Sequence, residues 1–359
     1  MLEKENRHCQ VKPGVYGGGI QMKRRTDIIS GMLLRMCLIF GALLSARFAA
    51  GAAQLSDAIQ DVERFSEWTG DTAQPAAEPQ NGTQPFGQGH DEASEGGDNL
   101  PGEQPETVSL DESWTWASNS AVHSGSATLY RAGGSLDAPG RKNLVVCVNA
   151  GHGTASGSNY ETLSHPDGTP KVTGGTTAQG AVYSTAVSSG MTFADGTSEA
   201  SANLMTALAL KNMLLKDGYD VLMIRESDDV QLDNIARTVI ANHSADIHVA
   251  IHFDYTQSDK GVYFCAVPDD ASYRQMEPVA SHWQEHMALG QALIQGMTAN
   301  GFWLFGDGTL PMDLTQTSYS TIPSVDIEIG DAASAHSPED CERYAQGLKD
   351  GIDLFFQTR

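Results

Sequence analysis

The sequence has few positive charges for its length, and this shortage excludes several kinds of partner. Its 359 residues include 22 Lys and Arg against 45 Asp and Glu, which gives a formal net charge of -23. A nucleic-acid-binding protein needs a basic surface that neutralises phosphates. Docking by charge on anionic lipids needs a similar surface, and so does docking on anionic wall polymers. We therefore expect no nucleic-acid partner and no attraction to a membrane through charge.

Cysteine is also scarce, and its spacing argues against a thiolate metal site. Of the five cysteines, Cys9 and Cys37 lie in or before a predicted targeting segment. The other three, Cys147, Cys265 and Cys341, are an odd number, and two of them fall in predicted buried strands. No CxxC pair is present in the sequence. We therefore expect free buried thiols with neither a metal nor a redox role.

A long uncharged apolar run is missing as well. The N-terminal residues 1–53 contain a largely apolar stretch, but Arg35 and Arg47 interrupt it, so that the longest uncharged run is 36–46. A membrane span needs about 20 consecutive apolar residues. Basic residues just after Met22, a short apolar core and small residues are typical of a secretory signal peptide. We predict export, with an uncleaved anchor as the alternative to a cleaved signal peptide.

Composition divides the rest of the chain into three parts. Residues 54–107 are rich in Gly, Pro, Gln, Asp and Glu and poor in aliphatic side chains. Because such a segment cannot bury enough apolar surface to offset its ordering entropy, we predict a disordered acidic linker. Residues 108–141 are expected to add a strand or hairpin to the domain. Residues 142–359 form the predicted folded domain.

Strands and helices alternate from residue 142 onward. Buried strands are predicted at 145–148, 220–225, 246–252, 261–267 and 323–329. Helices are predicted at 199–216, 231–243 and 277–300, and a last one begins at Ser337. Strands separated by helices of this length predict an α/β fold. Its sheet should be mostly parallel and twisted, with helices on both faces.

Polar side chains interrupt these buried strands near their carboxyl ends, where open α/β sheets place their ligands. They are His152, within an Ala-Gly-His-Gly sequence, His252 and Glu328. A fourth polar residue, Glu199, opens the first long helix. A buried ionised carboxylate is costly unless it is paired or bound to a metal. Two histidines and one carboxylate that leave a position open suit catalytic zinc, and a further glutamate suits a general base.

Six short motifs follow one another in a characteristic order. They are Ala150-Gly151-His152-Gly153, Glu199 with Asn203-Leu204, Arg225, Arg237 with Ile240-Ala241-Asn242, Ala245-Asp246 with Ile251-His252, and Ile327-Glu328-Ile329-Gly330. Their order and most of their spacing resemble the zinc-dependent N-acetylmuramoyl-L-alanine amidases of the type-3 family. The resemblance covers residues 142–356, which would then be the amidase catalytic domain.

The resemblance implies a reaction and a role for each site residue. In that family, the positions that match His152, Glu199 and His252 bind Zn²⁺, and the position of Glu328 is the catalytic glutamate. The reaction is hydrolysis, by zinc-activated water, of the amide between N-acetylmuramic acid and L-alanine in bacterial peptidoglycan. No substrate-binding residue is assigned.

The sequence departs from the family pattern at several positions. Asn149 stands where an aspartate is usual, Asp254 where an asparagine is usual, and Asp331 where a phenylalanine is usual. The segment 153–198 is long and rich in Gly, Ser and Thr, which resembles clostridial-type members. We expect these changes to affect the substrate groove and the rate more than the type of reaction.

Two other functions remain open. His282, Glu285 and His286 match the H-x-x-E-H pattern of inverzincin metalloproteases, although a solvated helix face is the simpler interpretation. A non-catalytic cell-wall-binding module would have no need of a buried Glu328, so we rank it lower. We expect a monomer that is secreted or associated with the cell wall, with a membrane-anchored form as the alternative.

Overall fold

The computed structural model describes residues 105–359. The predicted signal peptide or anchor, residues 1–53, lies outside the described residues, as does the predicted linker up to residue 104. Within the described part, no helix is both long and apolar enough to cross a membrane. Cys147, Cys265 and Cys341 are buried free thiols, as expected from their number and spacing.

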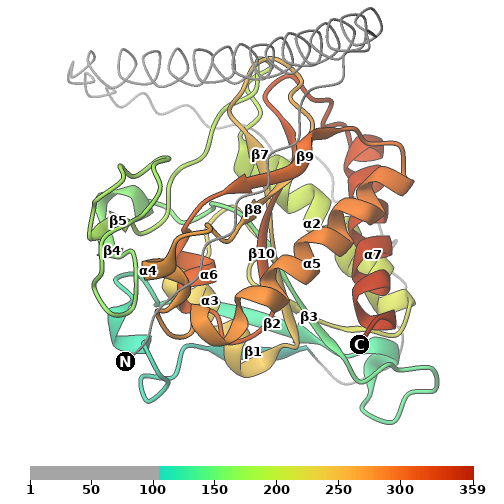
Figure 1. Ribbon diagram of the computed structural model, residues 1–359. Coiled ribbons are helices and arrows are strands. Elements are labelled where there is room, and N and C mark those ends of the chain that lie inside the picture. The colour runs from blue at the N-terminus through green and yellow to red at the C-terminus, as the bar shows by residue number, and fades with distance from the viewer. Residues whose placement is uncertain (1–104) are drawn as a thin grey trace, which may run out of the picture. The chain divides into compact units, whose positions relative to one another are not determined.

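One sheet of eight strands forms the centre of the fold (Figure 1), in the order β1-β2-β6-β3-β7-β10-β8-β9. The strands are β1 (Glu106–Ser109), β2 (Ser126–Tyr130), β3 (Val145–Ala150), β6 (Asp220–Met223), β7 (Ile247–Asp254), β8 (Val262–Ala266), β9 (Leu304–Pro311) and β10 (Ser324–Asp331). Neighbours pair in parallel at β6–β3, β3–β7, β7–β10 and β8–β9. They pair antiparallel at β1–β2, β2–β6 and β10–β8. The mostly parallel sheet confirms the predicted α/β fold.

Helices cover both faces of this sheet. One face carries α2 (Glu199–Lys216), α5 (Val279–Ala299) and α7 (Pro338–Gln357), and the other carries α3 (Asn234–Ser244) and α6 (Thr315–Tyr319). Side chains alternate along a strand, so Val146 and Val148 of β3 join the first core while Cys147 joins the second. This arrangement explains why the strand is apolar at successive positions instead of alternating.

Helix α3 shows how local sequence sets an element's boundary. It was predicted from residue 231, but it begins at Asn234 because the side chain of Asp233 accepts a hydrogen bond from the backbone N–H of Ala236. Such a cap satisfies a donor that the first helical turn leaves without a partner. Three strands and two helices were not predicted: β9, the antiparallel pair β4 (Glu161–Leu163) and β5 (Tyr183–Thr185), α4 (Ala271–Arg274) and α6.

Residues 108–141 supply most of an antiparallel extension of the sheet. Strand β1 pairs with β2, and β2 pairs with the edge of β6. Glu106 and Thr107, which the sequence analysis placed in the linker, belong to β1 and pair with Leu129 and Thr128. The predicted end of the linker at residue 107 is therefore wrong by two residues. The short β1 is mostly exposed, which explains why its polar composition resembled that of the linker.

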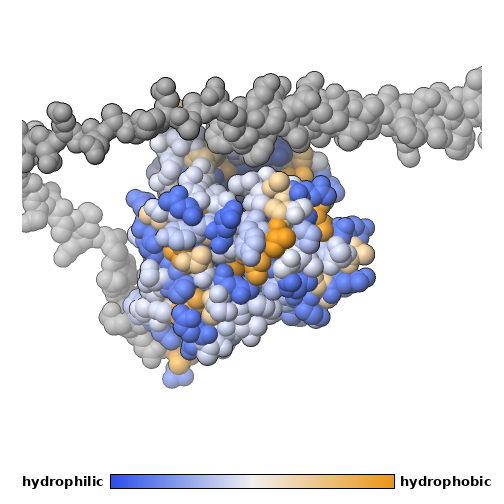
Figure 2. All heavy atoms as spheres, turned by 90° about the vertical axis from the view of Figure 1, so that its left-hand side faces the viewer, coloured by the Kyte–Doolittle hydropathy of each residue, from blue (hydrophilic) through white to orange (hydrophobic). Residues whose placement is uncertain are grey.

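The β4–β5 pair belongs to the long segment 153–198 and lies beside α4 and α6 at the left of the sheet in Figure 1. Figure 2 shows that the face on this side is mostly hydrophilic, with apolar side chains in small separate groups. Large exposed apolar side chains in the described residues are Leu136, Tyr160, Tyr183, Tyr255 and Trp303. Scattered apolar side chains of this kind are usual on a soluble domain.

Candidate metal centre

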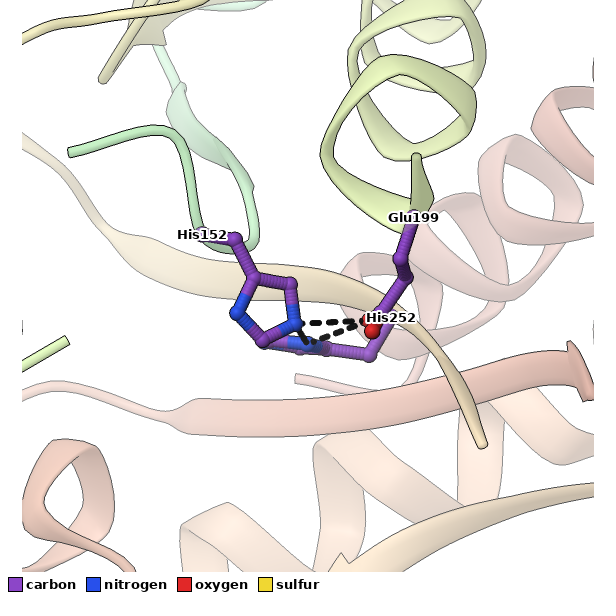
Figure 3. Close-up of side chains that lie close together, drawn as sticks. All are labelled: His152, Glu199 and His252. Carbon is purple, nitrogen blue, oxygen red and sulfur yellow. Dashed lines mark hydrogen bonds and ion pairs between the residues drawn. The ribbon is translucent and has the colours of Figure 1, made fainter. Parts of the chain in front are cut away.

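Three of the four predicted site residues meet at the carboxyl ends of the central strands (Figure 3). His152 lies two residues after the end of β3, Glu199 is the first residue of α2, and His252 lies near the end of β7. His152 Nε2 is 2.8 Å from Glu199 Oε1, and His252 Nδ1 is 3.1 Å from both of these atoms. Among the described residues, this is the one group of His, Cys, Asp or Glu whose ligand atoms could hold a metal ion together.

Close packing explains the glycine that precedes His152. A Cβ atom on Gly151 would lie 2.2 Å from Cε1 of His252, closer than any side chain tolerates. His152 itself has a φ of 62° and Gly153 a φ of 72°, so the chain turns sharply through the left-handed region. The Ala-Gly-His-Gly sequence therefore allows the imidazole of this turn and that of His252 on β7 to approach the same point.

Two buried arginines hold this turn in place. Arg225 donates hydrogen bonds to the carbonyl oxygens of Ala150 and Gly151, and Arg237 donates to those of Ala150 and His152. Burial lowers the pKa of Arg225 to about 10 and that of Arg237 to about 9, so both remain cationic at neutral pH. Carbonyl oxygens that cannot join the sheet ladder thus find partners in side chains.

The two ring nitrogens of His152 contact different groups, and these contacts show which nitrogen faces the site. His152 Nδ1 is 2.8 Å from the carbonyl oxygen of Ser188. A carbonyl only accepts, so Nδ1 carries a proton and Nε2 is the ring nitrogen that faces Glu199. Two residues later, Gly190 has a φ of +77°, and a Cβ there would lie 2.7 Å from Cδ2 of His152. The long segment 153–198, which was expected to affect the substrate groove, therefore forms one wall of the site.

Backbone groups orient the carboxylate of Glu199. Oε2 accepts from the N–H of Met191 at 3.0 Å, and Oε1 accepts from the N–H of Phe253 at 3.2 Å. Although burial raises the pKa of Glu199, the nearby His152 and His252 hold it well below its usual range. Burial lowers the pKa of His252. At neutral pH the site thus offers an ionised carboxylate and a neutral His252 imidazole, the protonation states that metal binding requires.

Glu328 lies beside this group without joining it. Strand β10 pairs in parallel with β7, and Glu328 is in register with His252. Its Oε2 atom is buried and has no hydrogen-bond partner among the described residues. Burial raises the pKa of Glu328 well above its usual range, and the nearby carboxylates of Glu199, Asp254 and Asp326 raise it further. A divalent cation held at the three-residue group would oppose this rise.

The residues that depart from the family pattern have partners within the fold. Asn149 accepts a hydrogen bond from Arg237, and its amide nitrogen is 3.2 Å from Nε2 of His248. Asp254 lies 2.6 Å from Nζ of Lys260. Asp331 accepts a hydrogen bond from the backbone of Ala333 just after β10. At each of these three positions, the polar side chain that replaces the usual family residue thus has a polar partner within the fold.

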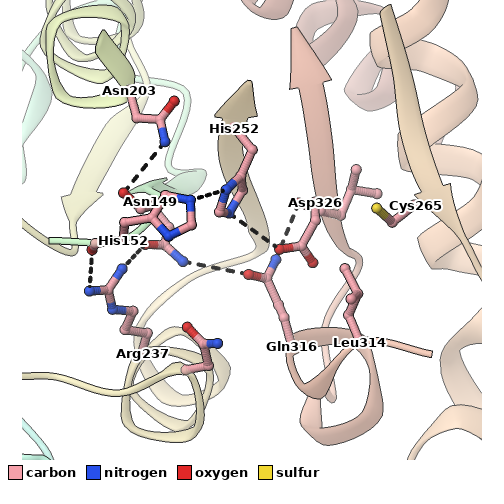
Figure 4. Close-up of polar contacts among 12 residues, drawn as sticks. Asn149, His152, Asn203, Arg237, His252, Cys265, Leu314, Gln316 and Asp326 are labelled. Carbon is pink, nitrogen blue, oxygen red and sulfur yellow. Dashed lines mark hydrogen bonds and ion pairs between the residues drawn. The ribbon is translucent and has the colours of Figure 1, made fainter. Parts of the chain in front are cut away.

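Sequence reasoning missed one buried carboxylate. Asp326 lies two residues before Glu328 on the same face of β10, and its Oδ1 atom is 3.8 Å from Nε2 of His252 (Figure 4). Burial raises the pKa of Asp326 to about 7. The signal was present, because a spacing of two along a strand places both carboxylates on one face. It was overlooked because the three-ligand motif already accounted for His252.

The alternative metalloprotease motif does not form a site. His286 is buried, and its Nδ1 atom accepts a hydrogen bond from the backbone N–H of Ser324. The His282 and His286 rings lie 6.4 Å apart between centroids, and Glu285 pairs with Arg359. Neither histidine belongs to the metal group found in the described part of the chain. The inverzincin alternative is therefore wrong, because one of its two histidines serves the packing of α5 on β10.

Comparison with known families places this geometry in context. A family model described as N-acetylmuramoyl-L-alanine amidase (Amidase_3) matches residues 146–353, which include all four predicted site residues. No match was found among curated proteins.

Several solved structures are similar to the chain. The apo N-acetylmuramyl-L-alanine amidase Ami1 from Mycobacterium abscessus is 21% identical, with a TM-score of 0.48, over 60% of this chain and 99% of that one. Ami1 from Mycobacterium smegmatis is 21% identical, with a TM-score of 0.47, over 60% and 98%. The CwlD amidase from Clostridioides difficile, solved in complex with the GerS lipoprotein, is 18% identical, with a TM-score of 0.43, over 60% and 100%.

Proposed function

Because the chain belongs to the N-acetylmuramoyl-L-alanine amidase family, we propose that His152, Glu199 and His252 hold the zinc ion with which it cleaves peptidoglycan. The enzyme hydrolyses the amide bond between N-acetylmuramic acid and L-alanine. The observation that carries the proposal is the convergence of three ligand atoms within 4.8 Å of one another. Two imidazole nitrogens and one carboxylate oxygen form a donor set that zinc prefers in catalytic sites.

The three residues fit the ion in charge as well as in position. Glu199 is ionised, the proton of His152 is directed at Ser188, and burial keeps His252 neutral. Bound there, Zn²⁺ supplies a Lewis acid that polarises the amide carbonyl and lowers the pKa of water. A site with three protein ligands leaves a position for substrate and water, whereas a fourth ligand would close it.

We assign the general base to Glu328. It lies in register with His252 on the neighbouring strand and stays outside the ligand group, which suits proton transfer better than coordination. Its carboxylate accepts the proton of the attacking water and returns it to the leaving amine nitrogen. Burial and the neighbouring carboxylates raise the pKa of Glu328, whereas a cation bound at the three-residue group would lower it, so Glu328 is placed to accept a proton and to return it.

We further infer that the enzyme acts outside the cytoplasmic membrane, because peptidoglycan lies there and residues 1–53 resemble a signal peptide or anchor. The experiment that tests the zinc site compares two histidines on the purified protein. His152→Ala should lose both stoichiometric zinc and dye release from labelled cell wall, whereas His282→Ala should keep both. Zinc content that follows His282 instead of His152 would overturn the proposal.

A further inference from the structure

His252 contacts different groups through its two ring nitrogens. Nδ1 faces the ligand group, 3.1 Å from Glu199 Oε1, while Nε2 faces Asp326 Oδ1 at 3.8 Å (Figure 4). An imidazole that binds a metal through one nitrogen keeps its proton on the other. With Nδ1 committed to the ion, Nε2 therefore carries an N–H that is directed towards the carboxylate of Asp326.

The two proposed histidine ligands have matching environments. His152 binds through Nε2 and has the carbonyl oxygen of Ser188 at 2.8 Å from Nδ1. His252 uses the opposite nitrogen, and the oxygen behind it belongs to a carboxylate. A metal-bound histidine generally has an oxygen acceptor on its far nitrogen, which sets the ring orientation and raises the basicity of the ligand. For His252, the carboxylate of Asp326 is the oxygen acceptor that faces the far nitrogen.

The cost of Asp326 to the fold supports a role in the site. Asp326 is only 9% exposed, and its Oδ2 atom has no hydrogen-bond partner among the described residues. It lies between Ser324 and Glu328 on one face of β10, beside Ala250 of β7. A buried carboxylate with an oxygen that lacks a hydrogen-bond partner destabilises the folded state. If only the stability of the fold mattered, an apolar residue would be favoured at position 326.

From these contacts we propose that Asp326 is a positioning residue. It accepts a hydrogen bond from the Nε2–H of His252 and thereby orients the ring so that Nδ1 faces the zinc ion. The inference rests on the proposed zinc site. The present separation of 3.8 Å exceeds hydrogen-bond length, and a movement of about 1 Å would close the difference. A cation on Nδ1 makes Nε2–H a stronger donor, so the contact tightens when the ion binds.

The test compares three variants of the full chain. Asp326→Leu removes the carboxylate at similar volume, Asp326→Asn keeps an uncharged oxygen acceptor, and Ser324→Ala changes the same face of β10 two residues earlier. Zinc affinity is measured by competition with a chelator, ligand geometry by the absorption spectrum of the Co²⁺ form, and fold stability by the thermal midpoint of metal-free protein.

We expect Asp326→Leu to weaken zinc binding by about 10- to 100-fold and to shift the Co²⁺ spectrum. Its metal-free midpoint should stay the same or rise, since the unpartnered carboxylate is gone. Asp326→Asn should lose less than about tenfold in affinity, because the amide oxygen can still accept the hydrogen bond. Ser324→Ala should bind zinc as the wild type does.

Two outcomes would overturn this role. One is wild-type zinc affinity in Asp326→Leu. The other is a lower metal-free midpoint in both Asp326 variants without a change in zinc affinity, which would make the residue purely structural. If Asp326→Leu fails to fold, unchanged zinc affinity in Asp326→Asn together with an unchanged Co²⁺ spectrum would also reject the proposal. Failure of the zinc site itself is separate, because the wild type would then bind no zinc, or His152→Ala would retain it.

Discussion

At the scale of single residues, Glu328 is where binding and chemistry can be told apart. Its position beside His252 and outside the ligand group predicts that Glu328→Ala retains near-stoichiometric zinc and a folded domain. Turnover should fall by about 10²–10⁴-fold, the usual effect of removing a general base. Zinc content and hydrolysis rate are measured on the same sample.

Either of two results would contradict the assignment of Glu328. Zinc lost in proportion to activity would make the residue a ligand and leave the base unidentified. Zinc retained with activity near the wild-type rate would remove Glu328 from the mechanism. Glu285→Ala serves as the control, since this glutamate lies on the outer part of α5 and pairs with Arg359.

Two buried histidines predict how stability depends on pH. Burial, with a smaller contribution from Arg237 at His248 and from His282 at His286, lowers the pKa of both histidines to about 3. Each binds fewer protons in the folded state than in the unfolded state below about pH 6.5. Their stabilising contribution is therefore complete above pH 6.5 and is lost as the pH falls towards 3. The slope is up to about 1.4 kcal/mol per pH unit for each histidine.

Denaturant unfolding of the metal-free protein at pH 7 and pH 5 tests this expectation. Asp326, whose pKa is raised to about 7, contributes with the opposite sign, so the comparison is made between variants. His286→Asn should lose less stability between the two pH values than the wild type, whereas His282→Asn, which removes only the smaller contribution to the His286 shift, should stay close to the wild type. Equal losses in all three proteins would show that His286 titrates normally in the fold.

At the scale of elements, one aspartate anchors the long segment 153–198. Asp313, which lies between β9 and α6, is fully buried and accepts from Lys171 Nζ at 2.8 Å. It also accepts from the backbone N–H of Val172, and its Oδ2 atom is 3.1 Å from Nε2 of His165. Although burial raises the pKa of Asp313, its hydrogen bonds hold it well below the usual range. The segment that contacts His152 through Ser188 is thus fastened at a distance from the site.

We expect Asp313→Ala to loosen this segment and to leave the buried Lys171 ammonium without its carboxylate, although the backbone carbonyl of residue 313 still accepts from it. Removing one member of a buried ion pair costs about 3–5 kcal/mol. Limited proteolysis should then cut within residues 161–185 faster than in the wild type, and zinc affinity should fall because the Ser188 wall moves. Asp307→Ala, an exposed change in β9, is the matched control. Wild-type cleavage rates in Asp313→Ala would show that other contacts hold the segment.

At the scale of the whole molecule, the structure predicts where the folded domain begins. Strand β1 starts at Glu106 and pairs with β2, which continues the sheet at β6. A chain that starts at residue 105 should therefore match the full chain in thermal midpoint and activity on cell wall. A chain that starts at residue 120 lacks β1 and the Trp114 ring stacked on His243, and should have a lower midpoint. Equal midpoints would mean that β1 adds nothing to stability.

Local sequence was sufficient to predict the buried strands of this protein, three of its site residues and its family. Runs such as 144–148 are apolar on both faces, so they predict buried parallel strands. Burying a polar residue at the end of such a run is costly, so a polar residue there indicates a functional role. On this ground the sequence predicts His152, His252 and Glu328 as site residues. The order of the six motifs indicated the amidase family, whereas each motif alone is too short to be specific.

Only the tertiary structure decided which further polar groups contact the three proposed metal ligands. The short, largely exposed β1 and the β4–β5 pair have too little apolar periodicity to be recognised in the sequence. The contact of Ser188 with His152 joins residues 36 apart, and that of Asp326 with His252 depends on the register between β10 and β7. Such contacts follow from how strands and loops are packed together, and local sequence does not encode them one residue at a time.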